Sequence, residues 1–342
     1  MTMQTNPLAG EENIPEARKA YSRACLFLLV FGGGWMLLIM LIGLIIGAAG
    51  LSGKISEEWD YGITYGTQAA IILPLTLLVA KRFGSPCRPE EHRMNIGRII
   101  LAYFCCETLA VGGNMIGITF NGILSRIVGF DTSFKQLEQS LMGDAGIVFM
   151  LCAVLIAPLT EEVVFRKILI DNTRKYGDFT AIILSGAMFG LMHANFTQFF
   201  YTMALGCFLA FIYVKTGRVR YTITLHVMMN TVGTIAPLLL RNYYSGLTEW
   251  TEALQKALQE SNIAEMLHLI LKMYPLLIYS GITWIFVITG LVLLLVYRKY
   301  FRLNPPIKPI PKNRRLQTVC LNPGFLLFFA YCMYRFVRLM TA

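Results

Sequence analysis

Two adjacent glutamates and an arginine stand in the middle of an apolar stretch, APLTEEVVFRKIL, at residues 157–169. Ionisable side chains are costly inside a membrane, so they mark a functional site by default. Glu162 and Arg166 are four residues apart, which places them on one face of a helix and lets them form an ion pair. Glu161 is turned about 100° away from Glu162, so it needs another partner. A glutamate that Arg166 does not neutralise is suited to act as a general base or acid.

Two further pairs, each with a histidine, follow in apolar surroundings. Phe189 and His193 lie one helical turn apart in SGAMFGLMHAN, and His226 and Asn230 lie one turn apart in TITLHVMMNTVG. Each pair therefore shares one face of its helix. At about 1.5 Å per residue, Glu161, His226 and Asn230 lie roughly 14, 9 and 15 Å from the ends predicted to be cytoplasmic, and His193 about 20 Å. One cavity that opens to the cytoplasm is therefore able to hold them all.

Each of these features has a structural explanation when it is taken alone. A histidine within a span usually packs, an asparagine often bonds a neighbouring helix, and a glutamate–arginine pair can be a structural lock. The chain has four histidines, and two of them lie in apolar helices close to the glutamate pair. The combination favours a catalytic site.

A divalent metal such as zinc is an open alternative for this site. Two histidines and a glutamate are the ligands of some catalytic zinc sites, and here they would be Glu161, His193 and His226. The sequence has no HExxH motif, its two histidines come from separate helices, and asparagine is a poor zinc ligand. We therefore favour chemistry without a cofactor.

The composition shows what kind of protein must position these residues. Of the 342 residues 56% are hydrophobic and only 15% are charged, whereas soluble domains carry about 25% charged residues. The mean hydropathy is +0.57. The formal net charge of +10 is typical of basic loops that face anionic lipid. No basic patch is interleaved with aromatic residues, so the sequence does not indicate a nucleic-acid partner.

The sequence predicts an all-α, polytopic bundle of about eight membrane spans. Each candidate is an apolar run near the length of about 20 residues that a span requires. The predicted spans are 24–50, 62–80, 98–122, 147–170, 179–193, 197–215, 221–241 and 274–297. A ninth apolar run, 323–341, is interrupted by Arg335 and Arg338, so it either spans or lies at the interface.

Loop charges predict the orientation of the bundle. Every second loop is basic, namely 81–98, 171–178, 215–220 and 298–315. Basic loops remain in the cytoplasm, so the N-terminus is expected to be cytoplasmic too. Without a signal-peptide pattern at the N-terminus, we expect an integral protein of the cell membrane.

Two loops on the opposite side have apolar residues at helical spacing. They contain SFKQLEQSLMGDAG, at 133–146, and WTEALQKALQESNIAEML, at 250–267. Such helices either lie on the membrane surface or cap the bundle. We favour the cap.

These patterns divide the chain into five regions. They are an N-terminal tail at 1–22, accessory spans at 23–145, a core with the polar pairs at 146–241, an amphipathic loop at 242–273, and a C-terminal span, basic linker and short apolar tail at 274–342.

The three polar groups resemble the motifs of the CAAX-protease and bacteriocin-processing (CPBP) family, which includes the Rce1-type prenyl-protein endopeptidases. The family patterns EExxxR, FxxxH and HxxxN correspond to three groups here, in order: Glu161, Glu162 and Arg166; Phe189 and His193; His226 and Asn230. Each motif is weak alone, but the set is specific on hydrophobic helices. The resemblance covers about residues 145–240.

The resemblance implies an intramembrane endopeptidase that acts on membrane-associated proteins or peptides. It makes Glu161 and His193 the pair that positions and activates water, and His226 and Asn230 the oxyanion donors. Amide hydrolysis independently requires such a base and such donors. No residue distinguishes a prenylated substrate from another peptide.

Two other functions compete with proteolysis. Glutamate, histidine and arginine within a membrane also build the proton paths of transporters, but transporters usually repeat such groups in both halves of the chain. Here they cluster in one half. An immunity or scaffold protein without catalysis is the second alternative, and the intact motif set disfavours it.

Overall fold

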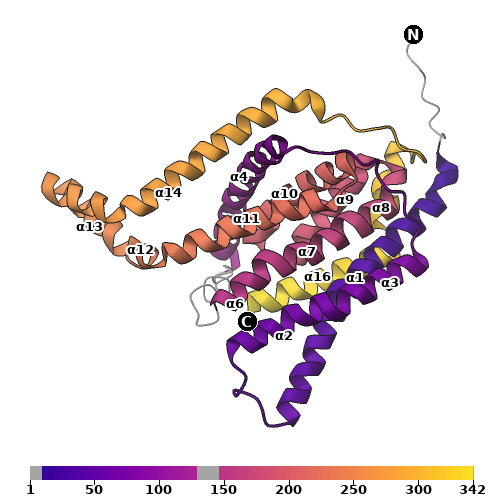
Figure 1. The fold of residues 1–342 in the computed structure, drawn as a ribbon, viewed down its shortest axis with the longest axis horizontal. Coiled ribbons are helices and arrows are strands. Elements are labelled where there is room, and N and C mark those ends of the chain that lie inside the picture. The colour runs from indigo at the N-terminus through magenta and orange to yellow at the C-terminus, as the bar shows by residue number, and fades with distance from the viewer. Residues whose placement is uncertain (1–9, 129–145, 342) are drawn as a thin grey trace.

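The computed structural model describes residues 10–128 and 146–341, and these form helices joined by turns and loops, without a strand (Figure 1). Three helices precede the long helix α4: α1 (Ile14–Ala48), α2 (Glu57–Thr67) and α3 (Leu73–Phe83). The remaining α-helices, in chain order, are α4 (Ile96–Val128), α6 (Gly146–Leu151), α7 (Ala157–Glu162), α8 (Leu169–Thr173), α9 (Asp178–Met192), α10 (Phe196–Thr216), α11 (Val219–Leu239), α12 (Arg241–Ser245), α13 (Leu247–Gln259), α14 (Ile263–Val296), α15 (Arg315–Cys320) and α16 (Pro323–Thr341).

Membrane-length helices dominate this arrangement. Among the described residues seven helices are long and apolar enough to span, or eight if the bent pair Lys312–Cys320 and Pro323–Leu339 counts as one. The all-α, polytopic prediction is confirmed. The spans differ in one respect, because predicted span 179–193 is the 15-residue helix α9. At 1.5 Å per residue α9 is about 22 Å long, short of the roughly 30 Å hydrocarbon core.

Two of the spans contain π-helical segments just before a proline. Gln68–Ile72 precedes Pro74, and Cys152–Ile156 precedes Pro158. Proline has no N–H and clashes with the carbonyl one turn earlier, and a wider π turn accommodates that defect. A further π-helical segment, Val163–Ile168, follows the glutamate pair.

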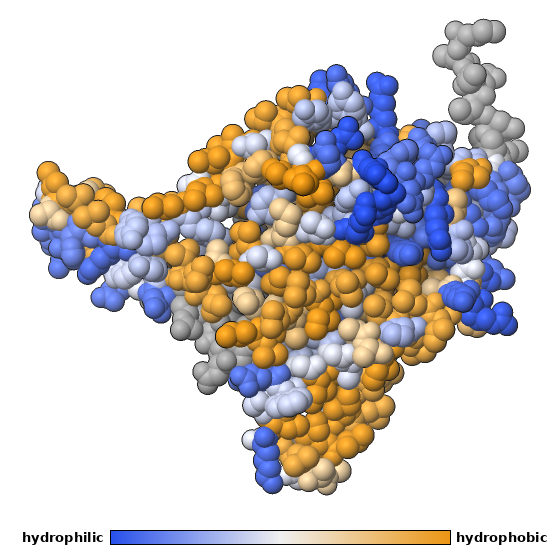
Figure 2. Space-filling view, in the orientation of Figure 1, coloured by the Kyte–Doolittle hydropathy of each residue, from blue (hydrophilic) through white to orange (hydrophobic). Residues whose placement is uncertain are grey.

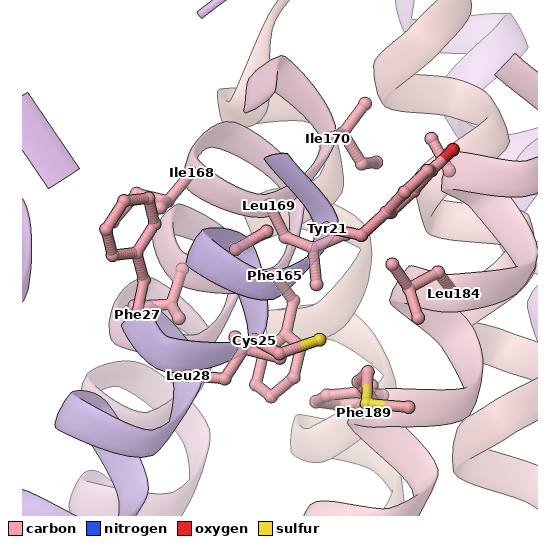
Figure 3. Close-up of a cluster of buried hydrophobic side chains, with 14 of the residues drawn as sticks. Tyr21, Cys25, Phe27, Leu28, Phe165, Ile168, Leu169, Ile170, Leu184 and Phe189 are labelled. Carbon is pink, nitrogen blue, oxygen red and sulfur yellow. The ribbon is translucent and has the colours of Figure 1, made fainter. Parts of the chain in front are cut away.

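The first helix provides the apolar wall behind these segments. Tyr21, Cys25 and Leu28 recur at helical spacing on α1 and are fully buried. They lie in one cluster with Phe165 and Leu169, which follow the glutamates (Figure 3). α1 therefore covers one side of the helical stretch that carries the glutamates.

The four basic loops lie at one end of the bundle, which we call the basic end: residues 84–95, 171–177, 217–218 and 301–311. Figure 2 shows hydrophilic residues gathered toward this end, near the N-terminal part of α1, and apolar surface over the helices beyond it. Backbone hydrogen bonds hold this end together. Cys87 donates to the Asp171 carbonyl oxygen, His92 to that of Thr216 at the end of α10, and Lys308 to that of Lys175. The predicted grouping of these loops on one side is confirmed.

The second amphipathic segment forms α13, which packs against α14 at the tip of an arm (Figure 1). The favoured interpretation, a cap over the bundle, is therefore wrong for this segment. α13 contacts α14 and α12 instead, and its Ala257 is buried there while Leu258 is exposed. The other predicted amphipathic segment, at 133–146, lies almost wholly outside the described residues.

Glycines let α9, which carries the second motif, pack closely on α10. A Cβ atom on Gly186 would lie 2.8 Å from the Met203 carbonyl oxygen, and one on Gly190 would lie 2.9 Å from that of Phe199. Both distances are shorter than side chains allow, so only glycine permits α9 and α10 to approach this closely.

Candidate active site

The Glu162–Arg166 pair lies at the centre of the polar cluster. Arg166 Nε and Nη2 donate to the two carboxylate oxygens of Glu162, at 2.9 and 3.2 Å. Both side chains are 0% exposed. Removing two ions from solvent is unfavourable, and only a bidentate geometry with further hydrogen bonds offsets it. The predicted pairing is confirmed.

Arg166 also contacts α9. Its Nη1 donates to Ser185 Oγ at 2.7 Å, and Ser185 in turn donates to the Phe165 carbonyl oxygen at 2.8 Å. The guanidinium carbon lies 5.0 Å from the centre of the Phe189 ring, a cation–π distance. One arginine therefore joins the helix of the first motif to the helix of the second.

His226 contacts both glutamates. Its Nδ1 lies 3.0 Å from Glu162 Oε1, and its Nε2 lies 3.9 Å from Glu161 Oε2. Because a carboxylate only accepts, the hydrogen on Nδ1 is donated to Glu162. The partner that the sequence left open for Glu161 is thus His226, which α11 supplies.

The two glutamates differ in exposure although they are neighbours. The Glu161 side chain is 21% exposed and that of Glu162 is fully buried. The Glu162 carboxylate oxygens accept hydrogen bonds from Arg166 and His226. Glu161 makes the longer contact with His226 Nε2, and its side chain stays partly accessible. Of the two carboxylates, Glu161 is the one able to meet a water molecule or a substrate.

Phe189 explains how His193 is oriented. The Phe189 carbonyl oxygen lies 2.9 Å from His193 Nδ1, so Nδ1 carries the hydrogen and Nε2 of the neutral ring has a free lone pair. The Phe189 ring meets His193 and His226 edge-to-face, with centroids 4.9 and 5.6 Å apart. The Phe189 ring therefore packs against both histidines, and the Phe189 carbonyl orients the His193 ring.

Asn230 is tied to the helix of the glutamates. Its Nδ2 donates to the Ala153 carbonyl oxygen at 2.9 Å. In the π-helical segment the Ala157 N–H donates to Cys152, so the matching donor for Ala153 would be residue 158, which is proline. Asn230 supplies the hydrogen bond that Pro158 cannot make. Its amide has two hydrogens, so one remains for another acceptor.

Replacing Asn230 by alanine is expected to destabilise the protein by about 1–3 kcal/mol, because the Ala153 carbonyl would lose its donor. The loss is expected to shrink in a Pro158→Ala background, where residue 158 regains an N–H. The loss in free energy of unfolding is measured for each background by unfolding the four proteins of this double-mutant cycle in mixed detergent micelles. Equal losses in both backgrounds would contradict the assignment.

Sequence reasoning missed several contacts of the cluster. Ser185, to which the sequence analysis assigned no role, accepts a hydrogen bond from Arg166. Gln68, which is buried in the π-helical segment before α3, accepts from Thr160 Oγ1 at 3.4 Å. A buried glutamine in an apolar run was the available signal for this neighbour of the glutamates.

The side chains do not fit a metal centre as they stand. Among residues 10–128 and 146–341, no three His, Cys, Asp or Glu side chains are arranged to hold an ion. In the candidate set Glu161, His193 and His226, one nitrogen of His226 already bonds Glu162.

Comparisons with known proteins agree with the motifs. Residues 143–232 match the family described as type II CAAX prenyl endopeptidase Rce1-like. This range contains all three motifs, so the predicted resemblance is confirmed for this part of the chain. A Bacillus subtilis (strain 168) protein named "Putative membrane peptidase YdiL" is 34% identical in an alignment over 142 residues, and the match covers 39% of this chain. The chain spans 58% of that relative's length. No solved structure matches the chain significantly.

Proposed function

We propose that the chain is an intramembrane endopeptidase whose Rce1-like segment is the catalytic core. One observation carries the proposal: three helical segments of an apolar bundle bring two glutamates, an arginine and a histidine into direct contact. Such a cluster is costly in lipid unless it serves a function. The substrate would be a membrane-associated protein or peptide.

Glu161 and His193 would activate the water that attacks the peptide bond. We propose that this water lies between the Glu161 carboxylate and the His193 ring. Glu161 retains an accessible face, and the Phe189 carbonyl keeps the lone pair of His193 on Nε2. Two acceptors on one water raise its nucleophilicity by general-base catalysis.

His226 and Asn230 would stabilise the oxyanion. Asn230 would donate the amide hydrogen that Ala153 does not use. His226 would donate from Nε2 in its imidazolium form, while Nδ1 stays bonded to Glu162. Donors that are already fixed by other contacts need no reorganisation during the reaction.

The mechanism that we propose uses no metal ion. The preference rests on the donor set, since Asn230 is a poor zinc ligand and both nitrogens of His226 face carboxylates. We further propose that the basic end faces the cytoplasm of the cell membrane, as its lysines and arginines favour, so that the N-terminus is cytoplasmic.

The function is tested by comparing new protein termini in membranes from cells that carry the wild type or Glu161→Ala at equal amounts. The expected result is a set of termini found only with the wild type, which would also identify the substrate. The same membranes with Glu58→Ala, an exposed residue of α2, are the matched control. Identical termini in all three would count against proteolysis.

A further inference from the structure

Helix α9 ends inside the bundle, and its end carries His193. The last carbonyl groups of a helix have no partner within it. In an apolar environment each must find a donor, because water is not there to supply one. The end of α9 is therefore a place where every hydrogen bond can be accounted for.

All but one of these bonds come from the turn itself. The His193 N–H donates to the Gly190 carbonyl oxygen, and the Ala194 N–H donates to that of Leu191. The His193 ring donates to the Phe189 carbonyl oxygen, and the Asn195 amide donates to that of His193. The Met192 carbonyl oxygen remains. Its donor is Arg335 Nη1, at 2.7 Å.

Arg335 comes from a distant part of the chain. It lies on α16, outside residues 143–232 that match the family. Its guanidinium lies 5.8 Å from the centre of the Tyr331 ring, and the neighbouring Phe336 packs on Phe196 at 4.9 Å. α16 is itself held against α1. The contacts of Tyr331 and Phe336 therefore hold in place the part of α16 that carries Arg335.

The turn after His193 is strained, which makes an external anchor necessary. Ala194 has φ +57°, a left-handed conformation that costs a residue with a Cβ about 1–2 kcal/mol. Such a conformation persists only when surrounding contacts fix it. A cation at the C-terminal end of a helix also interacts favourably with the helix dipole.

We propose that Arg335 is a positioning residue for His193, so that α16 belongs to the catalytic unit. By bonding Met192, it fixes the last turn of α9 and with it the Phe189 carbonyl that orients the His193 ring. The inference rests on the proposed function for its kinetic consequence, but its structural part can be tested separately. An arginine in an apolar helix is thereby explained.

The kinetic test uses the full chain with Arg335→Met, Arg335→Lys and Arg335→Gln. We expect Arg335→Met to lower kcat by about 10- to 100-fold, because small displacements of a catalytic group have effects of this size. KM should change less than about twofold, since substrate contacts are untouched. Arg335→Lys should recover part of kcat, because lysine can still donate to the Met192 carbonyl.

Arg338→Met is the matched control. Arg338 lies one turn further along the same helix and is exposed, so its replacement changes the charge of α16 while the hydrogen bond from Arg335 to Met192 remains. Wild-type kcat is expected for this variant. A loss equal to that of Arg335→Met would overturn the proposal.

A second readout does not depend on activity. The chain has four histidines, so the ¹⁵N ring signals of His193 can be assigned in the purified protein with the help of a His193→Gln variant. We expect the wild type to show a fixed Nδ1–H tautomer, and Arg335→Met to show tautomer exchange. Unchanged His193 signals together with unchanged kcat would overturn the proposal.

The two readouts separate the two hypotheses. If the wild type cleaves nothing, the proposed function fails, while the His193 signals still decide whether Arg335 positions the ring. If Arg335→Met does not yield folded protein, Arg335→Gln replaces it, because glutamine remains polar but is too short to repeat the contact. Wild-type His193 signals in that variant would overturn the inference.

Discussion

Replacing Glu161 by glutamine is expected to lower kcat on the order of 10³-fold, within the range that a general base contributes. Glutamine has nearly the same shape, but it cannot accept a proton from water. The fold should persist, because Glu161 is partly exposed and its recorded ionic contact is the long one with His226. Single-turnover cleavage of a peptide that spans an identified cleavage site would measure the loss.

The controls for Glu161→Gln are chosen to separate chemistry from folding. Glu58→Gln changes an exposed glutamate of α2 and should leave kcat unchanged. His193→Ala and His226→Ala should abolish activity as well, because they remove the other proposed partners of water and oxyanion. Full activity of purified Glu161→Gln protein would disprove the proposed mechanism.

Replacing Arg166 by methionine is expected to destabilise the bundle by about 3–5 kcal/mol and to abolish activity. The Glu162 carboxylate would remain fully buried without its bidentate partner, and an uncompensated buried charge costs this much. The contacts of Arg166 with Ser185 and the Phe189 ring would be lost too. Unfolding in mixed detergent micelles, followed by circular dichroism, measures the change.

A double variant tests the cause of that instability. Glu162→Gln combined with Arg166→Met removes both charges, so we expect it to regain most of the stability but no activity. Lys256→Met is the matched control, since Lys256 and Glu260 have the same spacing on the exposed side of α13, at 3.9 Å. Exposed pairs contribute about 0.3–0.5 kcal/mol. A similar loss from both single substitutions would show that burial is not the cause.

Periodicity and charge predicted much of the fold because the membrane restricts the alternatives. Apolar runs of span length must be helices, and the alternation of basic loops predicted which loops gather at one end. Helix length was predicted less well. The apolar run at 179–193 was counted as a span, but apolarity does not say whether a helix crosses or stops inside the bundle. That decision depends on what satisfies the end of α9.

The site was predictable where residues are close in sequence. The Glu162–Arg166 pair follows from helical spacing alone. The contact of His226 with both glutamates required the relative position of α11, which no spacing provides. The role of Asn230 depended on a π-helical segment before Pro158, and such segments leave little trace in hydropathy patterns. Arg335 was visible only as an interruption of an apolar run, without its partner.

The packing of α16 against α1 has a consequence for how the protein is made. Arg18 donates to the Leu321 carbonyl across 303 residues of sequence. At elongation rates of about 5–20 residues per second, α1 enters the membrane roughly 15–60 s before α16. Between the translation of Asn230 and that of Arg335, roughly 5–20 s at these rates, the Met192 carbonyl lacks its donor although all three motifs have been translated. The site in the nascent chain therefore stays incomplete until α16, the last of the described helices to be translated, supplies Arg335.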